Sequence, residues 1–503
     1  MRITIAEFGR RRVAVVTAIG LVVTACSDVP LPTGANAGQH TAPNAPARST
    51  EQDRFRTADE EEARIAREEV PGYAGSVLEK DGTRTILMAD TSDLATRLTR
   101  LRGHFDRQTQ HPIGGVRKVD YNFDELKRVR DVIVSRGLGS ARWSIFDVDE
   151  QANRVVVGVV DAAQIGPARA ALRELGVSDA MVTVLVVPPV VPDIYRPSSC
   201  SINMTNCGGE EEPPPPSPAA CIGLQCKQLQ LVGGLLMDFV TASGIRPEVP
   251  CTVGALAWFA GQHGIVTAGH CSANLASFDG TSFTQGLGST TVVATELWDR
   301  AATANPSWSP CPSGYGCRWS DALFAKLAPN APSIGGYIAR TTYRNVVDTN
   351  QARQLASLQG TRIVSQRTYL NNQITFNEPV VKVGHRTGTT DGVVSRTCID
   401  IWYGLANAQG QRVMLLCQYE VQPPIGFNFY AFHSGVGDSG APVYSQTSGG
   451  AMFYGILTAG VPNPYTPLGW SSISYVFSPI DQVQLDLQNH TSLFEQYLDV
   501  ITP

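Results

Sequence analysis

Near its carboxyl end the chain reads Gly437-Asp438-Ser439-Gly440-Ala441-Pro442-Val443. A serine hydroxyl is a weak nucleophile at neutral pH, so covalent catalysis by serine needs a base within hydrogen-bond reach. Glycine before the serine lets the backbone turn tightly, and the N–H groups of Gly437 and Ser439 can then point at a developing oxyanion. The segment therefore predicts Ser439 as a nucleophile and these two N–H groups as an oxyanion hole.

Two upstream segments supply the other groups that this chemistry requires. Thr267-Ala268-Gly269-His270-Cys271 offers His270 as a base that takes the serine proton and returns it to a leaving amine. Ser320-Asp321-Ala322-Leu323 offers Asp321 as the carboxylate that fixes the imidazole tautomer. Asp299 competes for this role, but an apolar strand pattern follows Asp321 and none follows Asp299.

These motifs, in the order His, Asp, Ser, resemble those of chymotrypsin-fold serine proteases, and most of all the bacterial streptogrisin and α-lytic protease branch. The resemblance covers residues 230–503 and implies an acyl-enzyme endopeptidase that needs no metal or organic cofactor. It implies His270 as general base, Asp321 as orienting acid and Ser439 as nucleophile. It also implies disulfides that join Cys251 to Cys271 and Cys398 to Cys417. Cys311 and Cys317 enclose a short loop before Asp321, and we expect them to pair.

Residues around the predicted nucleophile bear on the substrate pocket. His433, six residues before Ser439 and next to Ser434, either lines this pocket or is a packed or surface histidine. Thr458-Ala459-Gly460 occupies the strand that the resemblance assigns to the substrate backbone. A pocket for Arg or Lys needs a carboxylate at its base. No carboxylate stands six residues before Ser439, so trypsin-like specificity is not expected.

From about Val232 onward the chain is rich in Gly, Thr and Val, with short apolar runs separated by turn residues. This pattern predicts an all-β domain that is long enough for two small packed barrels. A helix is predicted over 479–487. Together with the resemblance, it predicts a double-barrel chymotrypsin-like protease domain over 230–503.

Residues 72–190 carry a different pattern. A hairpin over 73–88, a helix over 92–105, a strand over 115–121 and a helix from Asn122 to Arg136 precede two strands, a helix near Pro167 and a last strand over 180–187. We summarise the order as βαββαβ, an α+β domain with one small open sheet. Tyr121–Val160 resembles the pro-regions of the same protease branch, which implies a folding aid and inhibitor. An unrelated accessory binding domain is the alternative.

Residues 191–229 are rich in Pro, Glu and Cys and predict a solvated linker. Two close pairs flank its acidic stretch, Cys200 with Cys207 and Cys221 with Cys226, and we expect local pairing within each. Gly233-Gly234 resembles the start of a mature protease of the branch. The resemblance therefore places a processing cut within residues 226–232.

The first 25 residues predict an export signal. Three arginines precede the apolar stretch Val13–Ala25, which is too short to span a membrane. Val23-Thr24-Ala25-Cys26 resembles the lipobox of bacterial lipoproteins, which implies lipidation at Cys26, and Ser27 favours the outer membrane. A plain signal peptide cut after Ala25 is the alternative. Residues 26–71, poor in large apolar side chains, predict a flexible tether with a short helix around 59–69.

The remaining ten of the eleven cysteines all follow residue 199, which is typical of a disulfide framework in an exported protein. A net charge of −5 gives no reason to expect nucleic acid as a partner. The expected partners are peptide or protein substrates, the chain's own pro-region, and a membrane through a lipid. Two other functions stay open: a non-catalytic surface lipoprotein that binds through a protease-like fold, and an esterase, although an esterase frame would read Gly-x-Ser-x-Gly with the histidine last.

Overall fold

The computed structural model describes residues 57–105, 111–137, 142–187, 190, 222–240, 250–304, 311–367, 374–407, 410–424, 433–462, 472–488 and 498–500. The predicted signal peptide, Cys26 and three of the linker cysteines (Cys200, Cys207 and Cys221) lie outside these residues. Within the described ranges, no helix is both long enough and apolar enough to cross a membrane.

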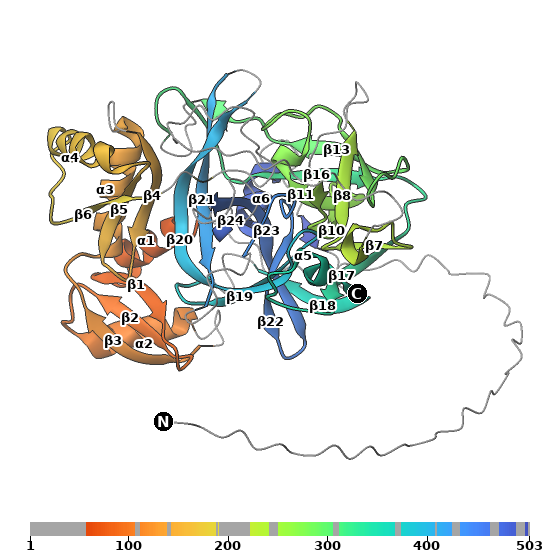
Figure 1. The fold of residues 1–503 in the computed structure, drawn as a ribbon. Helices are drawn as coiled ribbons and strands as arrows, with labels where there is room; N and C mark the ends of the chain where they lie inside the picture. The colour runs from red at the N-terminus through yellow and green to blue at the C-terminus, as the bar shows by residue number, and fades with distance from the viewer. Residues whose placement is uncertain are drawn as a thin grey trace, which may run out of the picture. The chain divides into compact units, whose positions relative to one another are not determined.

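The N-terminal part alternates helices and strands (Figure 1). Its elements are α1 (Ala58–Arg64), a π-helical turn (Ile65–Glu69), β1 (Tyr73–Leu78), β2 (Arg84–Met88), α2 (Leu94–Phe105), β3 (Ile113–Lys118), α3 (Phe123–Arg136), β4 (Trp143–Asp149), β5 (Arg154–Val159), α4 (Ile165–Glu174) and β6 (Val182–Val186). The predicted start of α3 is confirmed, because Asn122 and Glu125 form a reciprocal capping box. Its predicted end is confirmed as well: Gly137 follows the last turn at a φ of 71°.

The strands of this part divide between two sheets, whereas the sequence predicted one. Strands β1, β2 and β3 form a three-stranded sheet of their own. Strands β4, β5 and β6 instead belong to a fourteen-stranded sheet that continues into the C-terminal part. Strand β4 pairs with β5 on one edge and with the long strand β20 (Gly388–Ala406) on the other. Neither edge of β4 is therefore left to pair with β1, β2 or β3.

The helix predicted around residues 59–69 is present, but it is not part of a tether. Thr57 and Glu60 form a capping box at its start. Ile65, Ala66 and Val70 are buried in the core of the N-terminal part. The folded part therefore begins at Thr57 or earlier, and the boundary predicted at residue 72 lies too far along the chain.

The C-terminal part is almost wholly β, as its turn-rich pattern predicted. The strands are β7 (Leu231–Gly233), β8 (Leu236–Val240), β9 (Cys251–Thr252), β10 (Ala255–Phe259), β11 (Gln262–Ala268), β12 (Ser282–Gln285), β13 (Val292–Asp299), β14 (Thr303–Ala304), β15 (Tyr315–Arg318), β16 (Ala322–Leu327), β17 (Ser333–Thr341), β18 (Leu355–Gln366), β19 (Pro379–Gly384), β20, β21 (Arg412–Gln422), β22 (Pro442–Thr447), β23 (Gly450–Pro462), β24 (Ser472–Pro479) and β25 (Asp499–Val500). The helices are the short α5 (Thr349–Ala352) and α6 (Ile480–Gln488), the second of which confirms the helix predicted over 479–487.

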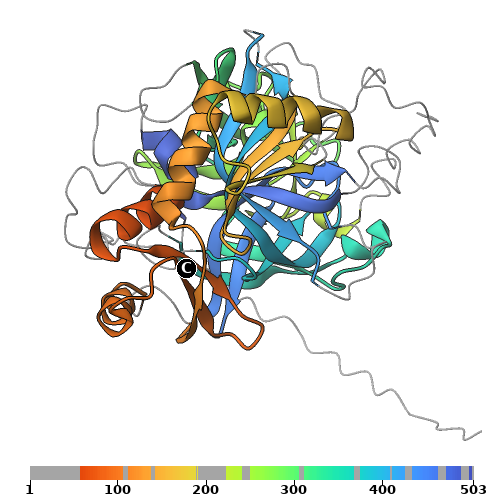
Figure 2. The same ribbon diagram turned by 90° about the vertical axis from the view of Figure 1, so that its left-hand side faces the viewer.

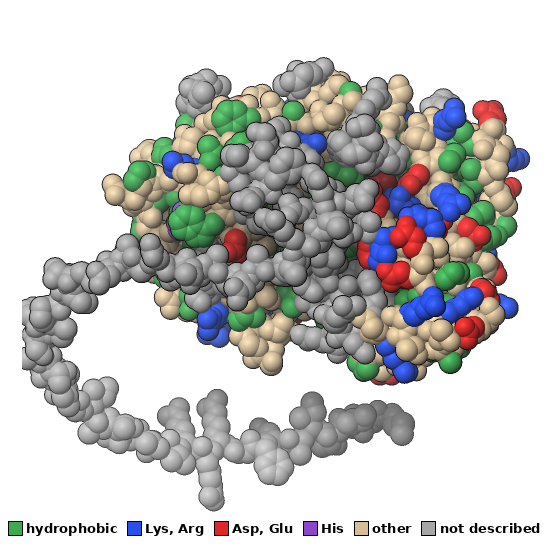
Figure 3. Space-filling view, turned by 180° about the vertical axis from the view of Figure 1, so that it is seen from behind, with side chains coloured by type: hydrophobic (Ala, Val, Ile, Leu, Met, Phe, Trp, Pro, Cys, Tyr) green, Lys and Arg blue, Asp and Glu red, His purple; other side chains and the backbone are tan. Residues whose placement is uncertain are grey.

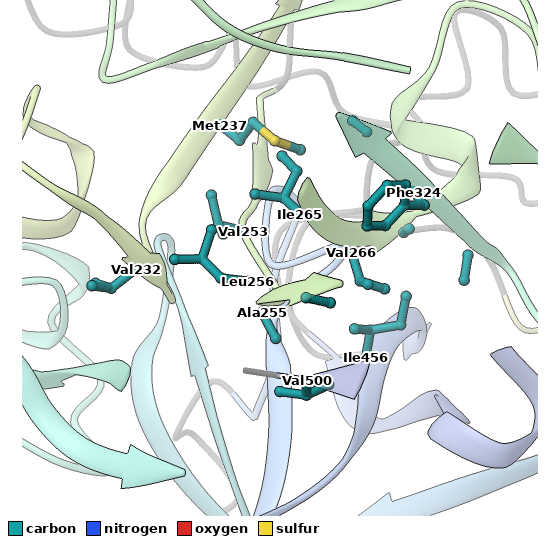
Figure 4. Packing of buried hydrophobic residues seen from close by; sticks show 14 of the residues in the cluster. Val232, Met237, Val253, Ala255, Leu256, Ile265, Val266, Phe324, Ile456 and Val500 are labelled. Atoms are coloured by element: carbon teal, nitrogen blue, oxygen red, sulfur yellow. The ribbon is translucent and has the colours of Figure 1, made fainter. Parts of the chain in front are cut away.

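Two sheets build this part. One has eight strands in the order β25-β10-β11-β16-β13-β12-β8-β9. The other is the fourteen-stranded sheet, in which β21, β24, β23, β22, β19 and β20 are consecutive neighbours. A core of aliphatic and aromatic residues, with Met237, Val253, Ile265 and Phe324 among them, packs against the first sheet and reaches Ile456 of β23 (Figure 4). Burial of such side chains stabilises the fold by about 25 cal/mol per Å² of apolar surface.

The end of the predicted linker packs on this core instead of lying in solvent. Leu224, in a short 3-10 turn, is fully buried, and its N–H donates to the carbonyl of Arg353. Leu229 by contrast is 87% exposed, and Leu231 two residues later is buried in β7. The predicted linker boundary at residue 229 is therefore several residues too late, because Leu224 supplies an apolar anchor within a segment otherwise poor in them.

The N-terminal part is joined to β20 by more than the β4 pairing. Arg130 of α3 forms an ion pair with Asp59 at 2.5 Å and donates to the carbonyl of Cys398 at 3.2 Å. Arg396 pairs with Asp147 of β4 at 3.0 Å. Figure 2 views the molecule from the side on which this N-terminal part lies in front.

Charged side chains gather over the N-terminal part on the face seen in Figure 3. Helices α1 and α3 and the π-helical turn between α1 and β1 line a hollow in this part, with Arg64, Arg67, Asp124, Lys127, Arg128 and Asp131. The two signs of charge pair with each other, for example Lys127 with Asp131 at 2.6 Å and Arg67 with Asp124 at 3.1 Å. Such a mixed surface gives no net field to attract a polyanion.

Candidate active site

His270 is fixed by the end of β11. The strand runs into a single 3-10 turn, Gly269–Cys271, in which His270 is the middle residue. A disulfide from Cys271 to Cys251 ties this turn to β9. The ring is 2% exposed, so its nitrogens meet protein groups and not bulk water.

Asp321 reaches the same place from the neighbouring strand. Strands β11 and β16 pair antiparallel with Ala268 opposite Ala322, which sets the residues that follow β11 beside those that precede β16. The backbone N–H of His270 donates to Asp321 Oδ1 at 3.1 Å. The backbone N–H of Asp321 itself donates to Ser478 Oγ at 2.9 Å.

Ser439 lies in a tight turn before β22. Gly437 has a φ of +105°, a region that L side chains rarely adopt, and a Cβ there would lie 2.6 Å from Cε1 of His385. Gly440 after the serine also has a positive φ, and a Cβ there would meet Thr267 Oγ1 at 2.1 Å. Both glycines of the Gly437–Gly440 segment are thus required by the backbone path that presents Ser439.

The three predicted residues meet in one hydrogen-bonded chain. Nε2 of His270 lies 2.7 Å from Oγ of Ser439. On the other side of the ring, Nδ1 of His270 is hydrogen-bonded to Oδ2 of Asp321. All three side chains are buried, which strengthens each polar contact by excluding water.

The pKa of Asp321 is lowered from its ordinary value. Burial alone would raise it, but His270, the nearby guanidinium of Arg318 and a hydrogen bond from Tyr403 favour the charged form more strongly. An ionised Asp321 is the state in which it can hold the proton on Nδ1 and leave Nε2 free to accept.

Asp299, the competing acid, lies close by but has another partner. It forms a buried ion pair with Arg318 at 2.9 Å. Burial raises the pKa of Asp299 to about 6, although Arg318 acts in the opposite direction. The same Arg318 faces Asp486 of α6 at 3.6 Å. Asp299 therefore belongs to a charged layer beneath Asp321 and does not contact the histidine.

The turn that carries Ser439 is anchored through Asp438. Its buried carboxylate pairs with Lys382 Nζ at 3.0 Å and accepts from Thr387 Oγ1 at 2.5 Å. It also accepts from the backbone N–H groups of Arg386, Thr387 and Gly435. The pKa of Asp438 is lowered, because Lys382 and these donors outweigh the effect of burial.

The two predicted oxyanion donors are available. Among the described residues, no acceptor takes a hydrogen bond from the N–H of Gly437 or of Ser439. The carbonyl of Gly437 points elsewhere, since it accepts from Thr252 Oγ1 at 2.9 Å. Buried N–H groups are normally paired, so both remain available to an acceptor.

His433 and Ser434 are both buried next to this turn. The ring of His433 lies 4.9 Å from that of Tyr475, and its Nε2 has no hydrogen-bond partner among the described residues. Burial, with a smaller effect from the charge on Lys382, lowers the pKa of His433 to about 3. The alternative of a surface histidine is therefore wrong, while its part in a substrate pocket stays a prediction.

Thr458, Ala459 and Gly460 lie in β23, where Gly460 is opposite Tyr475 of β24. Oγ1 of Thr458 donates to the carbonyl of Val476 at 3.2 Å, so it points into the sheet and not at Asp321. The carbonyl of Thr458 accepts from Tyr403 Oη at 2.9 Å. Sequence reasoning missed Tyr403, because a lone tyrosine within a long strand carries no motif.

The three predicted disulfides are present: Cys251–Cys271, Cys311–Cys317 and Cys398–Cys417. Cys226 is also disulfide-bonded. Among the described residues, only Cys251, His270 and Cys271 bring metal-ligand atoms close together, and their two sulfurs are held in the disulfide. A disulfide sulfur is not the thiolate that a metal needs.

No protein-family model matches the chain, and no curated protein does. Among solved structures, Thermobifida fusca protease A has 15% sequence identity and a TM-score of 0.32, over 54% of this chain and 100% of its own. A glutamic acid specific serine protease has 16% identity and a TM-score of 0.32, over 54% and 100%. Nocardiopsis protease has 18% identity and a TM-score of 0.31, over 54% and 99%. At these TM-scores the similarity assigns no role to any residue, and the site is defined by its own hydrogen bonds and ion pairs.

Proposed function

We propose that the chain is the precursor of an exported serine endopeptidase that cleaves peptide bonds through an acyl-enzyme. One observation carries the proposal: Ser439 Oγ lies 2.7 Å from His270 Nε2, while Asp321 is bound to the other nitrogen of the ring. A protein that only binds has no physical use for this chain of groups. An esterase would use the same chemistry, but the His, Asp, Ser order favours the peptidase.

In the proposed reaction, Ser439 Oγ attacks the scissile carbonyl carbon as its proton passes to His270 Nε2. The imidazolium then gives that proton to the leaving amine, and the acyl group stays on the serine. A water molecule, deprotonated by His270, attacks the acyl-enzyme and releases the second product. Asp321 stabilises the imidazolium in both halves of the reaction and keeps its own charge.

The free N–H groups of Gly437 and Ser439 would hold the oxyanion of each tetrahedral intermediate. Preorganised donors of this kind are worth roughly 2.7–4 kcal/mol each. Their positions depend on the turn that Asp438 anchors through Lys382 and Thr387. No metal or organic cofactor has a step in this mechanism.

The N-terminal part, residues 57–190, would act as an inhibitory pro-region and folding aid. Two contacts support this role. Strand β4 pairs with β20, and Val190, which follows β6, is buried in a cluster that includes Tyr403, Ala459 and Val461. Ala459 belongs to the segment Thr458–Gly460 predicted to bind the substrate backbone and Val461 follows it, so Val190 packs against the strand that a substrate would use.

Self-cleavage within residues 226–232 would separate the two parts. Leu229 is 87% exposed, and Lys227 and Gln230 beside it are exposed as well, so this stretch is accessible to a protease. Export through the signal of residues 1–25 and lipidation at Cys26 would leave the N-terminal part at the membrane. The protease part would be released, provided that no disulfide crosses the cut.

The test compares the unchanged chain with Ser439→Ala, both expressed with export intact and separated into membrane and medium fractions. We expect the unchanged chain to split near residue 229 and to release the C-terminal fragment, while Ser439→Ala stays whole and membrane-bound. If both chains stay whole and neither cleaves peptide, the result favours the alternative, a non-catalytic lipoprotein that only binds. If both split alike, another protease does the processing.

A further inference from the structure

Tyr403 of β20 touches both partners of the His–Asp pair. Its hydroxyl oxygen lies 2.6 Å from Oδ2 of Asp321 and 2.5 Å from Nδ1 of His270. We propose that Tyr403 is a positioning residue that fixes the His270–Asp321 pair through its hydroxyl. The inference rests on the proposed function for its effect on catalysis, but the contact itself can be tested without it.

The hydroxyl has one proton and two acceptors within reach, Asp321 Oδ2 and the carbonyl of Thr458. A carboxylate accepts a stronger hydrogen bond than a neutral carbonyl, so Asp321 is the favoured acceptor. The oxygen of Tyr403 can at the same time accept from Nδ1–H of His270. The three groups then form a closed ring of hydrogen bonds that fixes the tautomer and the tilt of the imidazole.

The other described side chain that could fill this role points away. Thr458 lies next to the pair, but its Oγ1 donates to the carbonyl of Val476. Among the described residues, His270 and Tyr403 are the side chains hydrogen-bonded to Oδ2 of Asp321, and Oδ1 accepts from the backbone N–H of His270. The charged groups that face Asp321 from its other side are Arg318 on β15 and, beyond it, Asp299 on β13.

The surroundings hold Tyr403 in place. The residue is fully buried, and its ring centroid lies 5.8 Å from that of His270. It packs in a cluster with Ile145 of β4, Ala459 of β23 and Val190. Ile401, two residues earlier, is paired with Leu415 of β21 on one edge and with Ile145 on the other. A side chain held from three strands has little rotamer freedom to lose when it makes its hydrogen bonds.

The substitution that tests this role is Tyr403→Phe, which removes the hydroxyl and keeps the ring. Tyr454→Phe on β23 is the matched control, because Tyr454 is also buried and its hydroxyl also bonds a carboxylate, that of Glu378, away from His270. We follow the titration of His270 by NMR on chains carrying ¹³C-labelled histidine, with His270→Gln to assign its signal.

Tyr403→Phe removes a donor to Asp321 and an acceptor of Nδ1–H at once, so it changes the hydrogen bonds on both members of the His270–Asp321 pair. We therefore expect the NMR titration curve of His270 in Tyr403→Phe to differ from that of the unchanged chain, and no change in Tyr454→Phe. For the peptidase reaction we expect kcat to fall roughly 10- to 100-fold with little change in KM, the effect of losing one hydrogen bond to a charged group.

Equal titration of His270 in Tyr403→Phe and the unchanged chain, with equal kcat, would overturn the inference. A shift in both phenylalanine variants would also overturn it, since the effect would then be general. If the unchanged chain cleaves no peptide, the proposed function fails, while the NMR titration still decides whether Tyr403 governs the His–Asp pair.

Discussion

The Lys382–Asp438 ion pair is predicted to hold the turn that presents Ser439, and Lys382→Met measures its contribution. Both groups are fully buried and lie 3.0 Å apart. Removing one partner of a buried pair costs about 3–5 kcal/mol, because it leaves an uncompensated charge. Four donors to Asp438 remain in the variant, one from Thr387 Oγ1 and three from backbone N–H groups. We therefore expect the lower end of that range, about 3 kcal/mol.

The effect of Lys382→Met on the free energy of unfolding depends on pH, because Asp438 is a titratable group. In the unchanged chain the pKa of Asp438 is lowered, so the ionised group contributes stability above its unfolded pKa and loses it as pH falls. In Lys382→Met burial acts on Asp438 without the lysine to oppose it, so the pKa of Asp438 is higher than in the unchanged chain and the penalty is largest at neutral pH. The difference in unfolding free energy between the two chains should therefore shrink between pH 7 and pH 4.

Urea unfolding at several pH values, followed by tryptophan fluorescence, measures this difference. The double variant Lys382→Met with Asp438→Asn removes both charges and should recover much of the loss. Peptidase activity should fall in Lys382→Met even at a urea concentration of zero, since the oxyanion donors move with the turn. An unfolding free energy of Lys382→Met equal to that of the unchanged chain, or a deficit that grows as pH falls, would show that this ion pair does not stabilise the turn.

Asp321→Asn should lower kcat by about 10⁴-fold in steady-state kinetics on a peptide substrate, because it favours the wrong tautomer of His270. Asp299→Asn should not cause such a loss. A large loss of kcat in Asp299→Asn and none in Asp321→Asn would mean that Asp299 is the orienting acid. Gly437→Ala should destabilise the chain by about 1–3 kcal/mol through its φ of +105° and the contact with His385, as measured by thermal unfolding; an unchanged Tm would contradict the assigned backbone path. Burial raises the pKa of Asp59 and of Asp147 to about 7, so their protonated forms favour the packed state, and the contact of the N-terminal part with β20 should weaken as pH rises from about 4 to 7. Hydrogen exchange of the β4 and β20 amides, corrected for the intrinsic rate, should therefore be faster at pH 8 than at pH 5. Faster exchange at pH 5 would contradict this prediction.

The sequence supported the prediction of the three reacting groups because each is part of a short motif with a chemical reason. Asp321 could be preferred over Asp299 because the apolar Ala322-Leu323-Phe324 follows it, and in the structure this segment is β16, paired with the strand that leads to His270. The local elements of residues 73–187 could be predicted from caps and turns, such as Asn122 and Gly137 around α3.

Contacts between distant segments could not be predicted in the same way. Tyr403 is 82 residues from Asp321 along the chain, and nothing in the alternation of β20 distinguishes it from a core tyrosine. Lys382 belongs to no recognisable motif, and its burial against Asp438 depends on how β19 meets the serine turn. The division of the N-terminal strands between two sheets depends on β20 taking the free edge of β4, which no local pattern encodes.

Reaction with a fluorophosphonate is the most direct test of the claim that Ser439 is a nucleophile activated by His270. The processed chain would be treated with the reagent, and its intact mass and the modified peptide would be measured by mass spectrometry. We expect one phosphonyl group on Ser439 in the unchanged chain, and none in Ser439→Ala or His270→Ala that the unchanged chain has first cut in trans. A folded, processed chain that gains no mass, or that is labelled equally in His270→Ala, would contradict it.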